Sequence, residues 1–328
     1  MRVSHAGAFF ARFRAIFCIY KAPVIHIIET EAQKGGACVH FTKMNGAGND
    51  FIILENLDRA LAHQALPDIA RALCDRRMSI GADGLMVLEP ADSGAADFRM
   101  LFYNSDGSMG EMCGNGARCV CRYGFEHGLS GEVQRIQTTA GLVTGRRVDK
   151  SNYRIALNLP GVVRLQQTLP ADGGQFTCDY LELGSPGIPH AAVTYPNLAA
   201  ADENRLRGLG RSLRFHAAFP RGANVDFYEL TGPDTLLVKP YERGVEDFTY
   251  ACGTGAGATV AALTLRGIVT GRNVRVVMRG GELFVDAEVE DGAIKALYLT
   301  GPTRLVAAGE ALEEAFLPES SKNGRKKT

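Results

Sequence analysis

Two cysteines head the same pentapeptide, Cys-Gly-x-Gly-Ala, at residues 113–117 and again at residues 252–256. The chain has 8 Cys and 38 Gly in 328 residues. Chance would supply only about 0.1 copies of Cys-Gly-x-Gly in such a chain, so the pair indicates two matched thiols. A lone cysteine in a Gly-rich turn is more often a buried structural residue, and the duplication argues against that reading here.

Both cysteines precede segments with helical spacing that end in Gly, residues 117–128 and 256–267. The N-terminus of a helix offers unpaired N–H groups and the positive end of the helix dipole. We therefore expect a ligand carboxylate to bind there, and we expect the same field to favour thiolate over thiol. The glycines allow the backbone to approach that ligand closely.

Two thiols on opposite sides of one carbon can invert its configuration. One thiolate removes the proton, and the opposite thiol delivers another. The α-proton of an amino acid is weakly acidic, so the developing carbanion needs hydrogen bonds and dipoles in a water-poor site. Two converging helix N-termini supply that field without a cofactor.

Metal and cofactor chemistry is the alternative. Cys113, Cys119 and Cys121 are close along the chain, but no Cys-x-x-Cys or adjacent His completes a zinc-type set, so we expect no metal. No P-loop occurs, and no Gly-x-Gly-x-x-Gly follows a strand with a fitting acidic residue. Pattern alone does not rule out a pyridoxal-phosphate lysine, although no Lys stands beside a phosphate-cradling loop. We expect no cofactor.

Short apolar runs bounded by Gly, Pro, Asp and Asn predict strands, and fewer segments have helical spacing. Helices are expected at residues 57–73, after each cysteine motif, and at residues 202–213; strands are expected at residues 51–54, 85–88, 98–103, 153–157, 191–194, 225–230 and 274–278. The pattern is typical of a strand-rich α/β or α+β protein.

A second pair of similar segments accompanies the cysteine motifs. Residues 46–51 (Gly-Ala-Gly-Asn-Asp-Phe) resemble residues 222–227 (Gly-Ala-Asn-Val-Asp-Phe), and each precedes its own motif. This order favours two pseudo-symmetric lobes with the active site in the cleft between them. We expect an N-terminal lobe at 41–160 and a C-terminal lobe at 161–312.

The chain ends differ from the rest. Residues 1–40 contain no acidic residue before Glu29, which is typical of an organelle transit peptide or a weak signal sequence; alternatively, translation starts near Met44 and the segment has no structural role. We expect a poorly ordered extension there and a disordered basic tail at 313–328.

Composition bounds the class of partner. The chain is 46% hydrophobic and 22% charged, with a formal net charge of zero. That composition is globular and offers no electrostatic footprint for nucleic acid or a membrane surface, so the expected partner is a small molecule. Eight Cys without regular short spacing indicate reduced thiols and a cytoplasmic protein.

Several segments together resemble one enzyme family over roughly residues 40–310. They are Lys43 to Phe51, Ile80 to Gly84, Asn104 to Ser108, Met112 to Arg118, Pro189-His190, Asn224 to Phe227, Glu242 to Gly244 and Cys252 to Gly255. These segments look like those of diaminopimelate epimerases. The resemblance implies a cofactor-independent, homodimeric epimerase that converts LL- to meso-diaminopimelate for lysine and peptidoglycan synthesis. Each lobe is then a strand-rich, barrel-like sheet around a central helix.

The resemblance also implies roles for individual residues. Cys113 and Cys252 match the two bases, and the residues expected to hold the reacting carboxylate are Gly114, Asn115, Gly253 and Thr254. The residues expected to grip the rest of the substrate are Asn49, Asn104, Asn224, Glu242 and Arg243, with Asp83 and His190 in support. Arg243 suits a distal carboxylate and Glu242 an ammonium group. Alternatively, the asparagines cap turns, Glu242 and Arg243 form a surface ion pair, and His190 is a packed loop residue.

Two positions depart from the family pattern. Ile188 stands where the family has Asn, and Phe248 stands where a Glu is expected, so both make the expected site more apolar. The alternatives are a two-cysteine racemase or epimerase for another amino acid, of the histidine or hydroxyproline type, a non-catalytic amino-acid-binding relative, and a metal-binding module.

Overall fold

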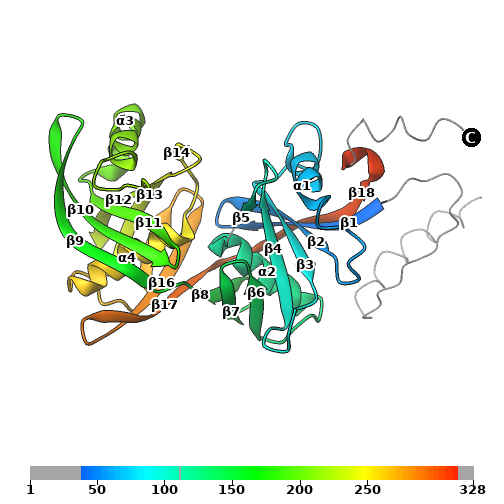
Figure 1. Ribbon diagram of the computed structural model, residues 1–328. Helices are drawn as coiled ribbons and strands as arrows, with labels where there is room; N and C mark the ends of the chain where they lie inside the picture. The colour runs from blue at the N-terminus through cyan, green and yellow to red at the C-terminus, as the bar shows by residue number, and fades with distance from the viewer. Residues whose placement is uncertain (1–37, 111, 317–328) are drawn as a thin grey trace, which may run out of the picture. The chain divides into compact units, whose positions relative to one another are not determined.

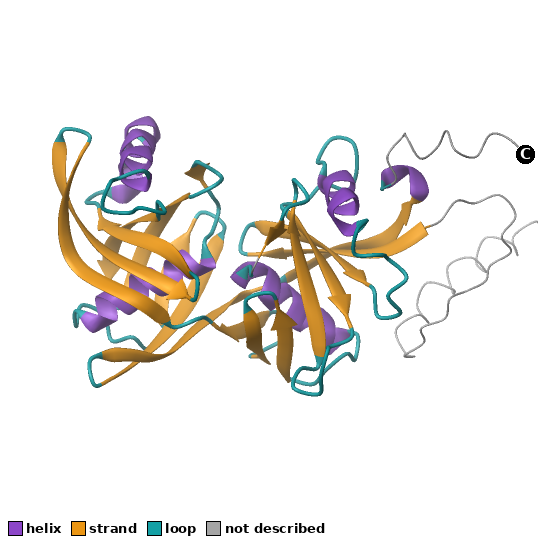
Figure 2. Ribbon diagram, viewed as in Figure 1, coloured by secondary structure: helices purple, strands orange, loops and turns teal. Residues whose placement is uncertain are grey.

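The computed structural model describes residues 38–110 and 112–316. Strands dominate this part of the chain, and Figure 2 shows the few helices among them. The strand-rich mixed α/β class expected from the sequence is confirmed. None of the helices in the described residues is long and apolar enough to cross a membrane. The extension and the tail expected at 1–40 and 313–328 lie almost entirely outside the described residues.

The chain runs through two series of elements. The first is β1 (Cys38–Gly46), β2 (Asn49–Glu55), α1 (Leu66–Cys74), β3 (Gly84–Glu89), β4 (Phe98–Asn104), β5 (Met109–Gly110), α2 (Gly114–Glu126), β6 (Val133–Thr138), β7 (Gly141–Arg147) and β8 (Asn152–Ala156). The second is β9 (Pro160–Ala171), β10 (Gly174–Gly184), β11 (Gly187–Thr194), η1 (Leu198–Ala200), α3 (Glu203–Arg214), β12 (Asn224–Gly232), β13 (Thr235–Glu242), β14 (Asp247–Phe248), α4 (Gly253–Leu265), β15 (Val274–Met278), β16 (Gly281–Glu290) and β17 (Ala293–Pro302). The last elements are β18 (Arg304–Leu312) and η2 (Glu313–Ala315).

Strand pairing repeats between the two series. In the first, β2 is parallel to β3, β3 is antiparallel to β4, and β4 is parallel to β6, with α2 between β5 and β6 in the chain. In the second, β11 is parallel to β12, β12 is antiparallel to β13, and β13 is parallel to β15, with α4 between β14 and β15. The two cysteine motifs therefore begin equivalent helices of a duplicated topology.

The last strand of the chain returns to the first. β18 pairs with β1, while β17 pairs with β8, so residues late in the chain hydrogen-bond to both ends of the first series. Figure 1 shows the chain running through β17 and β18 from the strands around α4 to those around α2. The lobe boundaries expected at 41–160 and 161–312 stay a prediction. Residues 304–312 fall in the expected C-terminal range, yet as β18 they pair with β1, which lies at the start of the first series.

The central strands β2 and β3 are buried on both faces. In β2, Phe51 and Ile53 pack in the cluster around α2 and α4, whereas Ile52 and Leu54 pack in a second cluster with α1. A third cluster covers the equivalent face of the second series with α3. Strands buried on both faces have continuous apolar runs, which is why residues 51–54 and 85–88 lack alternation.

One expected helix is shorter than its pattern. α1 begins at Leu66, with Pro67 in its first turn, and residues 57–65 form turns. The Asn56 side chain holds that loop: its Nδ2 donates to Leu61 O at 3.0 Å, and its Oδ1 accepts from Leu61 N at 2.8 Å. The expected helix at 202–213 is confirmed as α3, whose N-terminal amide at Arg205 donates to the Asp202 side chain.

Candidate active site

The two cysteines occupy the same position at two helix ends. Cys113 precedes α2 with φ −130° and ψ 116°, and Cys252 precedes α4 with φ −118° and ψ 109°. Each carbonyl accepts a first-turn bond, from Ala117 N at 2.8 Å and from Ala256 N at 3.0 Å. The duplicated pentapeptide is therefore one local structure used twice, as predicted.

The two helix ends touch. Asn115 Nδ2 donates to Ala251 O at 3.2 Å. A side-chain carbon added to Gly253 would lie 3.8 Å from Gly114 Cα and 2.7 Å from the Leu299 side chain, so glycine permits this approach. Because first-turn N–H groups have no partner within their helix, the junction gathers donors suited to one carboxylate. The predicted carboxylate-binding residues Gly114, Asn115, Gly253 and Thr254 all lie at this junction.

Asn49 is connected to this junction through hydrogen bonds. Asn115 Nδ2 donates to Asn49 Oδ1 at 2.5 Å, and Asn49 Nδ2 donates to Asp83 Oδ2 at 3.1 Å. Arg76 then bridges Asp83 and Asp50, at 2.7 Å and 2.6 Å from its Nη2. The Asp83 side chain is 40% exposed, so these hydrogen bonds connect the protein surface to the N-terminal end of α2.

Asn224, Glu242 and Arg243 come together where β12 begins and β13 ends. Asn224 Oδ1 accepts from Arg243 N at 2.8 Å, and its Nδ2 donates to Pro189 O at 3.2 Å. Glu242 accepts from Thr249 Oγ1 at 2.5 Å, and burial raises the pKa of this carboxyl above its usual range. Asn224 thus uses its side chain to hold the backbone on both sides of it.

Asn104 ends β4, the counterpart of β13, but its contacts are local. Its Nδ2 donates to Ser108 Oγ at 2.9 Å, and its backbone N donates to Ser108 O at 2.9 Å. Within residues 38–110 and 112–316, no hydrogen bond joins the Asn104 side chain to another predicted site residue.

His190 and Asp226 form a buried pair beside Cys252. His190 Nδ1 lies 2.8 Å from Asp226 Oδ2, and both side chains are 0% exposed. One potential ligand atom from each of these three residues lies within 4.8 Å of the others. The second nitrogen of His190 and the second oxygen of Asp226 have no hydrogen-bond partner in the described part of the chain. His190 thus lies close to the thiol, and Asp226 is a neighbour that the sequence reasoning did not single out.

At both thiols, burial raises the pKa more than the N-terminus of the helix lowers it. Burial raises the pKa of Cys113 to about 11, against smaller lowering effects of the Gly116 and Asn115 amides. Burial also raises the pKa of Cys252 well above its usual range; Glu242 and Asp226 add to the rise, and the Gly255 amide opposes it. The helix-end amides thus lower the pKa of each thiol in the expected direction, but removal from water disfavours the charged form more strongly, so the pKa of each thiol stays raised in the ligand-free protein.

The two departures from the family pattern have different surroundings. The Phe248 ring packs 5.8 Å from the Tyr241 ring and 6.3 Å from the Phe227 ring, in the cluster around α3. Phe248 is partly buried and packs against that cluster, and its effect on the polarity of the site stays a prediction. Ile188 lies on β11 two residues before His190, whose strand partner is Asn224. Asn49 lies two residues before Phe51 on β2, the equivalent strand, so Ile188 and Asn49 are counterparts.

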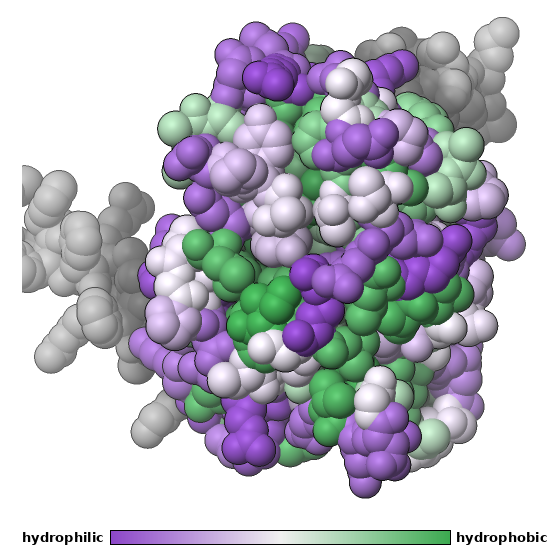
Figure 3. Space-filling view, turned by 90° about the vertical axis from the view of Figure 1, so that its left-hand side faces the viewer, coloured by the Kyte–Doolittle hydropathy of each residue, from purple (hydrophilic) through white to green (hydrophobic). Residues whose placement is uncertain are grey.

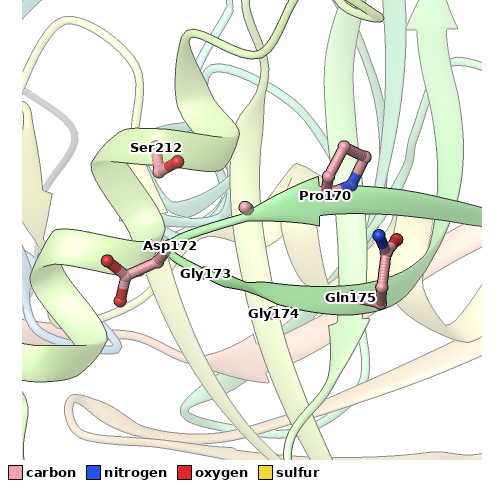
Figure 4. A pocket seen from close by; sticks show the side chains of 7 residues that line it. Pro170, Asp172, Gly173, Gly174, Gln175 and Ser212 are labelled. Carbon is pink, nitrogen blue, oxygen red and sulfur yellow. The ribbon is translucent and has the colours of Figure 1, made fainter.

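A surface hollow lies apart from these residues. It is formed at the turn between β9 and β10 against α3 and is lined by Pro170, Ala171, Asp172, Gly173, Gly174, Gln175 and Ser212 (Figure 4). None of the predicted site residues lines it.

Solved structures share this fold. A probable proline racemase from Agrobacterium radiobacter superposes with a TM-score of 0.64 at 19% identity, covering 85% of this chain and 94% of its own. A hydroxyproline epimerase from Agrobacterium vitis gives 0.62 at 17% identity, covering 86% and 96%. A PhzF-family protein from Bacillus anthracis gives 0.65 at 14% identity, covering 84% and 99%. The fold is thus that of the racemase and epimerase class to which the first two structures belong.

Sequence comparison narrows the class. The diaminopimelate epimerase profile matches residues 41–156 and 184–306. Diaminopimelate epimerase from Aquifex aeolicus is 35% identical over 286 residues, covering 85% of this chain and 99% of the relative. The enzyme from Desulforudis audaxviator is 37% identical over 289 residues, covering 83% and 99%. The chain therefore belongs to the diaminopimelate epimerase family and is an isomerase.

Proposed function

We propose that this protein interconverts LL- and meso-diaminopimelate with Cys113 and Cys252 as the two bases, for lysine and peptidoglycan precursor synthesis. The observation that carries the proposal is the pair of cysteines at equivalent, touching helix N-termini. A carboxylate bound at that junction has its α-carbon beside both motifs. Family membership supports the choice of substrate.

The reaction needs one thiolate and one thiol at a time. The thiolate of one cysteine takes the α-proton, the electron pair moves into the α-carbon and carboxylate, and the opposite thiol returns a proton to the other face. First-turn N–H groups at Gly114, Asn115, Gly253 and Thr254 stabilise the charge that develops on the carboxylate. The sequence of steps ends with the roles of the cysteines exchanged.

Substrate binding supplies a charge that the free site lacks. Both thiols have a raised pKa because they are buried. The α-ammonium group of the substrate brings a cation next to the thiols, and an opposite charge within a few ångströms favours the thiolate. Ionisation is therefore coupled to occupancy of the site.

We assign binding of the distal end of the substrate to Asn104 and to three residues of the second series of elements, Asn224, Glu242 and Arg243. Arg243 can pair with the distal carboxylate through two parallel hydrogen bonds, and the Glu242 carboxylate suits the distal ammonium group. Asn224 positions this pair through its bond to Arg243 N. Asn49 and Asp83 orient Asn115, and His190 supports Cys252.

An epimerase for another amino acid is the second candidate, and Ile188 favours it. Its counterpart Asn49 carries an amide, so one polar group of a symmetric pair is missing. Histidine and hydroxyproline are the substrates to compare.

We also propose that the protein is cytoplasmic, needs no cofactor, and forms a homodimer. All described cysteines are free thiols, in keeping with a reducing compartment. β18 is exposed along nearly its whole length, with Val306 53% and Leu312 64% exposed, so it offers an apolar edge to a second copy. Light scattering on the purified protein would give twice the chain mass if this is right, and a single chain mass if it is not.

The direct test is incubation of purified, reduced protein with LL-diaminopimelate in deuterated water, followed by chiral chromatography and mass spectrometry. Formation of the meso isomer with deuterium at the inverted carbon is expected. Histidine and hydroxyproline serve as comparison substrates. Neither isomerisation nor exchange of diaminopimelate, with turnover of one of the others, would replace the first candidate by the second.

A further inference from the structure

The turn between β1 and β2 is packed between the two cysteine motifs. It spans residues 46–48, Gly-Ala-Gly. A side-chain carbon added to Gly46 would lie 2.7 Å from the backbone oxygen of Asn115, in the first turn of α2. One added to Gly48 would lie 2.7 Å from Tyr250 Cβ, just before the second motif. The β1–β2 turn therefore approaches both motifs at positions that have no side chain.

A second turn, between β15 and β16, packs against the same residues. A carbon added to Gly280 in this turn would lie 2.1 Å from Ala47 O and 3.0 Å from Gly48 Cα. The backbone N of Gly280 donates to Tyr250 O at 2.8 Å. Gly280 does not have a positive φ, so close packing, and not backbone conformation, requires glycine at this position.

Hydrogen bonds connect these turns to the helix ends. Asn49, which follows the β1–β2 turn, accepts from Asn115 Nδ2 at 2.5 Å, and Asn115 Nδ2 also donates to Ala251 O at 3.2 Å. The β1–β2 turn is thus held to the end of α2, while Gly280 holds the segment that leads to Cys252. The contact between the two turns therefore sets the spacing of the two motifs.

An alanine at position 280 would change that spacing. Its Cβ would begin 2.1 Å from Ala47 O, whereas Cβ atoms essentially never approach another heavy atom within 3.0 Å. Both contacting groups belong to backbone, so the two turns have to move apart by about 1 Å. Because Gly280 is bonded to Tyr250, the shift displaces Cys252 relative to Cys113.

We propose that Gly280 is a positioning residue for the reaction. Its lack of a side chain lets the β15–β16 turn hold the Cys252 segment against the β1–β2 turn, and this contact places the second thiol opposite the first. The inference rests on the proposed function, in which both thiols act on one α-carbon.

The consequence can be measured because the carbanion formed by one thiolate has two fates. The opposite thiol protonates the other face and inverts the carbon, or the same cysteine returns a proton to the original face after its S–H has exchanged with solvent. In deuterated water, both products carry deuterium, and chiral chromatography with mass spectrometry separates inverted from uninverted product. A smaller folded fraction lowers both rates equally, whereas a displaced thiol changes their ratio.

The variants test the contact from both sides. Gly280→Ala is the first, and Gly48→Ala is the second, because its added carbon would lie 2.9 Å from Gly280 Cα. Arg279→Met is the control in the same turn, since the Arg279 guanidinium lies 4.8 Å from the Tyr250 ring centre. Gly131→Ala, with no atom within 4 Å of the added carbon, is the control for the substitution itself. Circular dichroism and urea unfolding select the variants that fold.

Both LL- and meso-diaminopimelate serve as starting substrates. Gly280→Ala and Gly48→Ala are expected to lower the inversion rate by up to about a hundredfold, because a misplacement of about 1 Å has effects of that size. The ratio of uninverted to inverted deuterated product should rise roughly tenfold for the isomer whose α-proton faces Cys113. Both controls should keep the wild-type ratio.

An unchanged ratio for both isomers in a folded Gly280→Ala or Gly48→Ala variant overturns the proposal. An equal rise in Arg279→Met also overturns it, because that result assigns the effect to the Tyr250 ring instead of the spacing. If the wild type does not invert diaminopimelate, the proposed function fails, and the ratio is measured with histidine or hydroxyproline, whichever the wild type inverts. Inversion of none of the three overturns both proposals.

Discussion

Gly255, the second glycine of the second cysteine motif, is a position where one added methyl group should disturb the residues beside Cys252. A carbon added there would lie 2.2 Å from Asp226 Oδ1 and 2.9 Å from Asp226 Cγ. Asp226 is fully buried and bound to His190, so its carboxylate cannot turn into solvent to make room. Gly255→Ala must therefore displace Asp226 and disturb the group beside Cys252.

The size of the effect follows from three contributions. Overpacking a core costs about 1–3 kcal/mol, and losing a hydrogen bond to a charged group costs about 1.5–3 kcal/mol. Alanine in a helix returns about 1 kcal/mol relative to glycine. We expect a net loss of about 3 kcal/mol in the free energy of unfolding.

Urea unfolding of matched variants measures this loss. Gly116→Ala is the equivalent change in the first motif, where the added carbon meets the flexible end of Met86 at 1.9 Å; we expect a loss of about 1 kcal/mol at most. Gly208→Ala on α3 meets no atom within 4 Å and should stabilise by up to about 1 kcal/mol. The Gly255→Ala midpoint should fall by on the order of 1 M urea. A Gly255→Ala midpoint equal to that of Gly208→Ala would refute the reasoning.

Three further outcomes are expected. Because the pKa of Cys113 is raised to about 11, kcat/KM should rise about tenfold per pH unit between about pH 6 and 8; a plateau at neutral pH would contradict the burial of the thiols. Arg243→Met should raise KM for diaminopimelate roughly tenfold to a hundredfold through loss of a charge-assisted contact, and an unchanged KM would remove Arg243 from the distal site. Asp83→Ala should lower kcat/KM roughly tenfold, because Asn49 loses its hydrogen-bond acceptor. The free energy of unfolding should fall by less than about 1 kcal/mol, because the Arg76–Asp83 ion pair is half-exposed. A larger loss of stability with full activity would make Asp83 a structural residue instead.

The seven strands expected from apolar runs are all present, because such runs follow from burial, whereas the long strands β9, β10, β16, β17 and β18 were not predicted. The apolar runs at residues 51–54 and 85–88 lie in strands covered on both faces, and the structure has strands there. The similarity between residues 46–51 and 222–227 was misleading about which strands correspond, although the duplicated strand topology is present. Asn49 opens β2 and Asn224 opens β12, whereas the counterpart of β2 is β11. Strand pairing reveals the true correspondence, in which Ile188 of β11 is the counterpart of Asn49 of β2.

The surface of the fold is not uniformly polar. Figure 3 shows a face on the side of β9 and β10 where apolar and polar residues are mixed, and Val163 of β9 is 40% exposed. Residues 57–65 have helical spacing, yet the Asn56 side chain and Pro67 set a turn and a late helix start. Local hydrogen bonds of this kind override propensity.

The position of each cysteine at a helix N-terminus could be predicted from the sequence, because each motif and its helix are contiguous in the chain. The charges around them were not, because they come from distant parts of the chain. Parallel pairing of β11 with β12 brings His190 to Asp226 across 36 residues, and burial of Arg118 depends on Gly301 of β17 leaving room for it. For the same reason the direction of the thiol pKa could not be predicted, since desolvation is set by tertiary packing.

The central claim is that Cys113 and Cys252 act as a pair on one carbon. The most direct measurement is the rate of LL- to meso-diaminopimelate conversion, with deuterium incorporation, by Cys113→Ala and Cys252→Ala beside the wild type and a Cys178→Ala control. We predict that each active-site variant loses at least about a thousandfold in rate, because neither thiol can both remove and return the proton across the carbon. The control should keep the wild-type rate. Epimerisation by either active-site variant at the wild-type rate would contradict the two-base account.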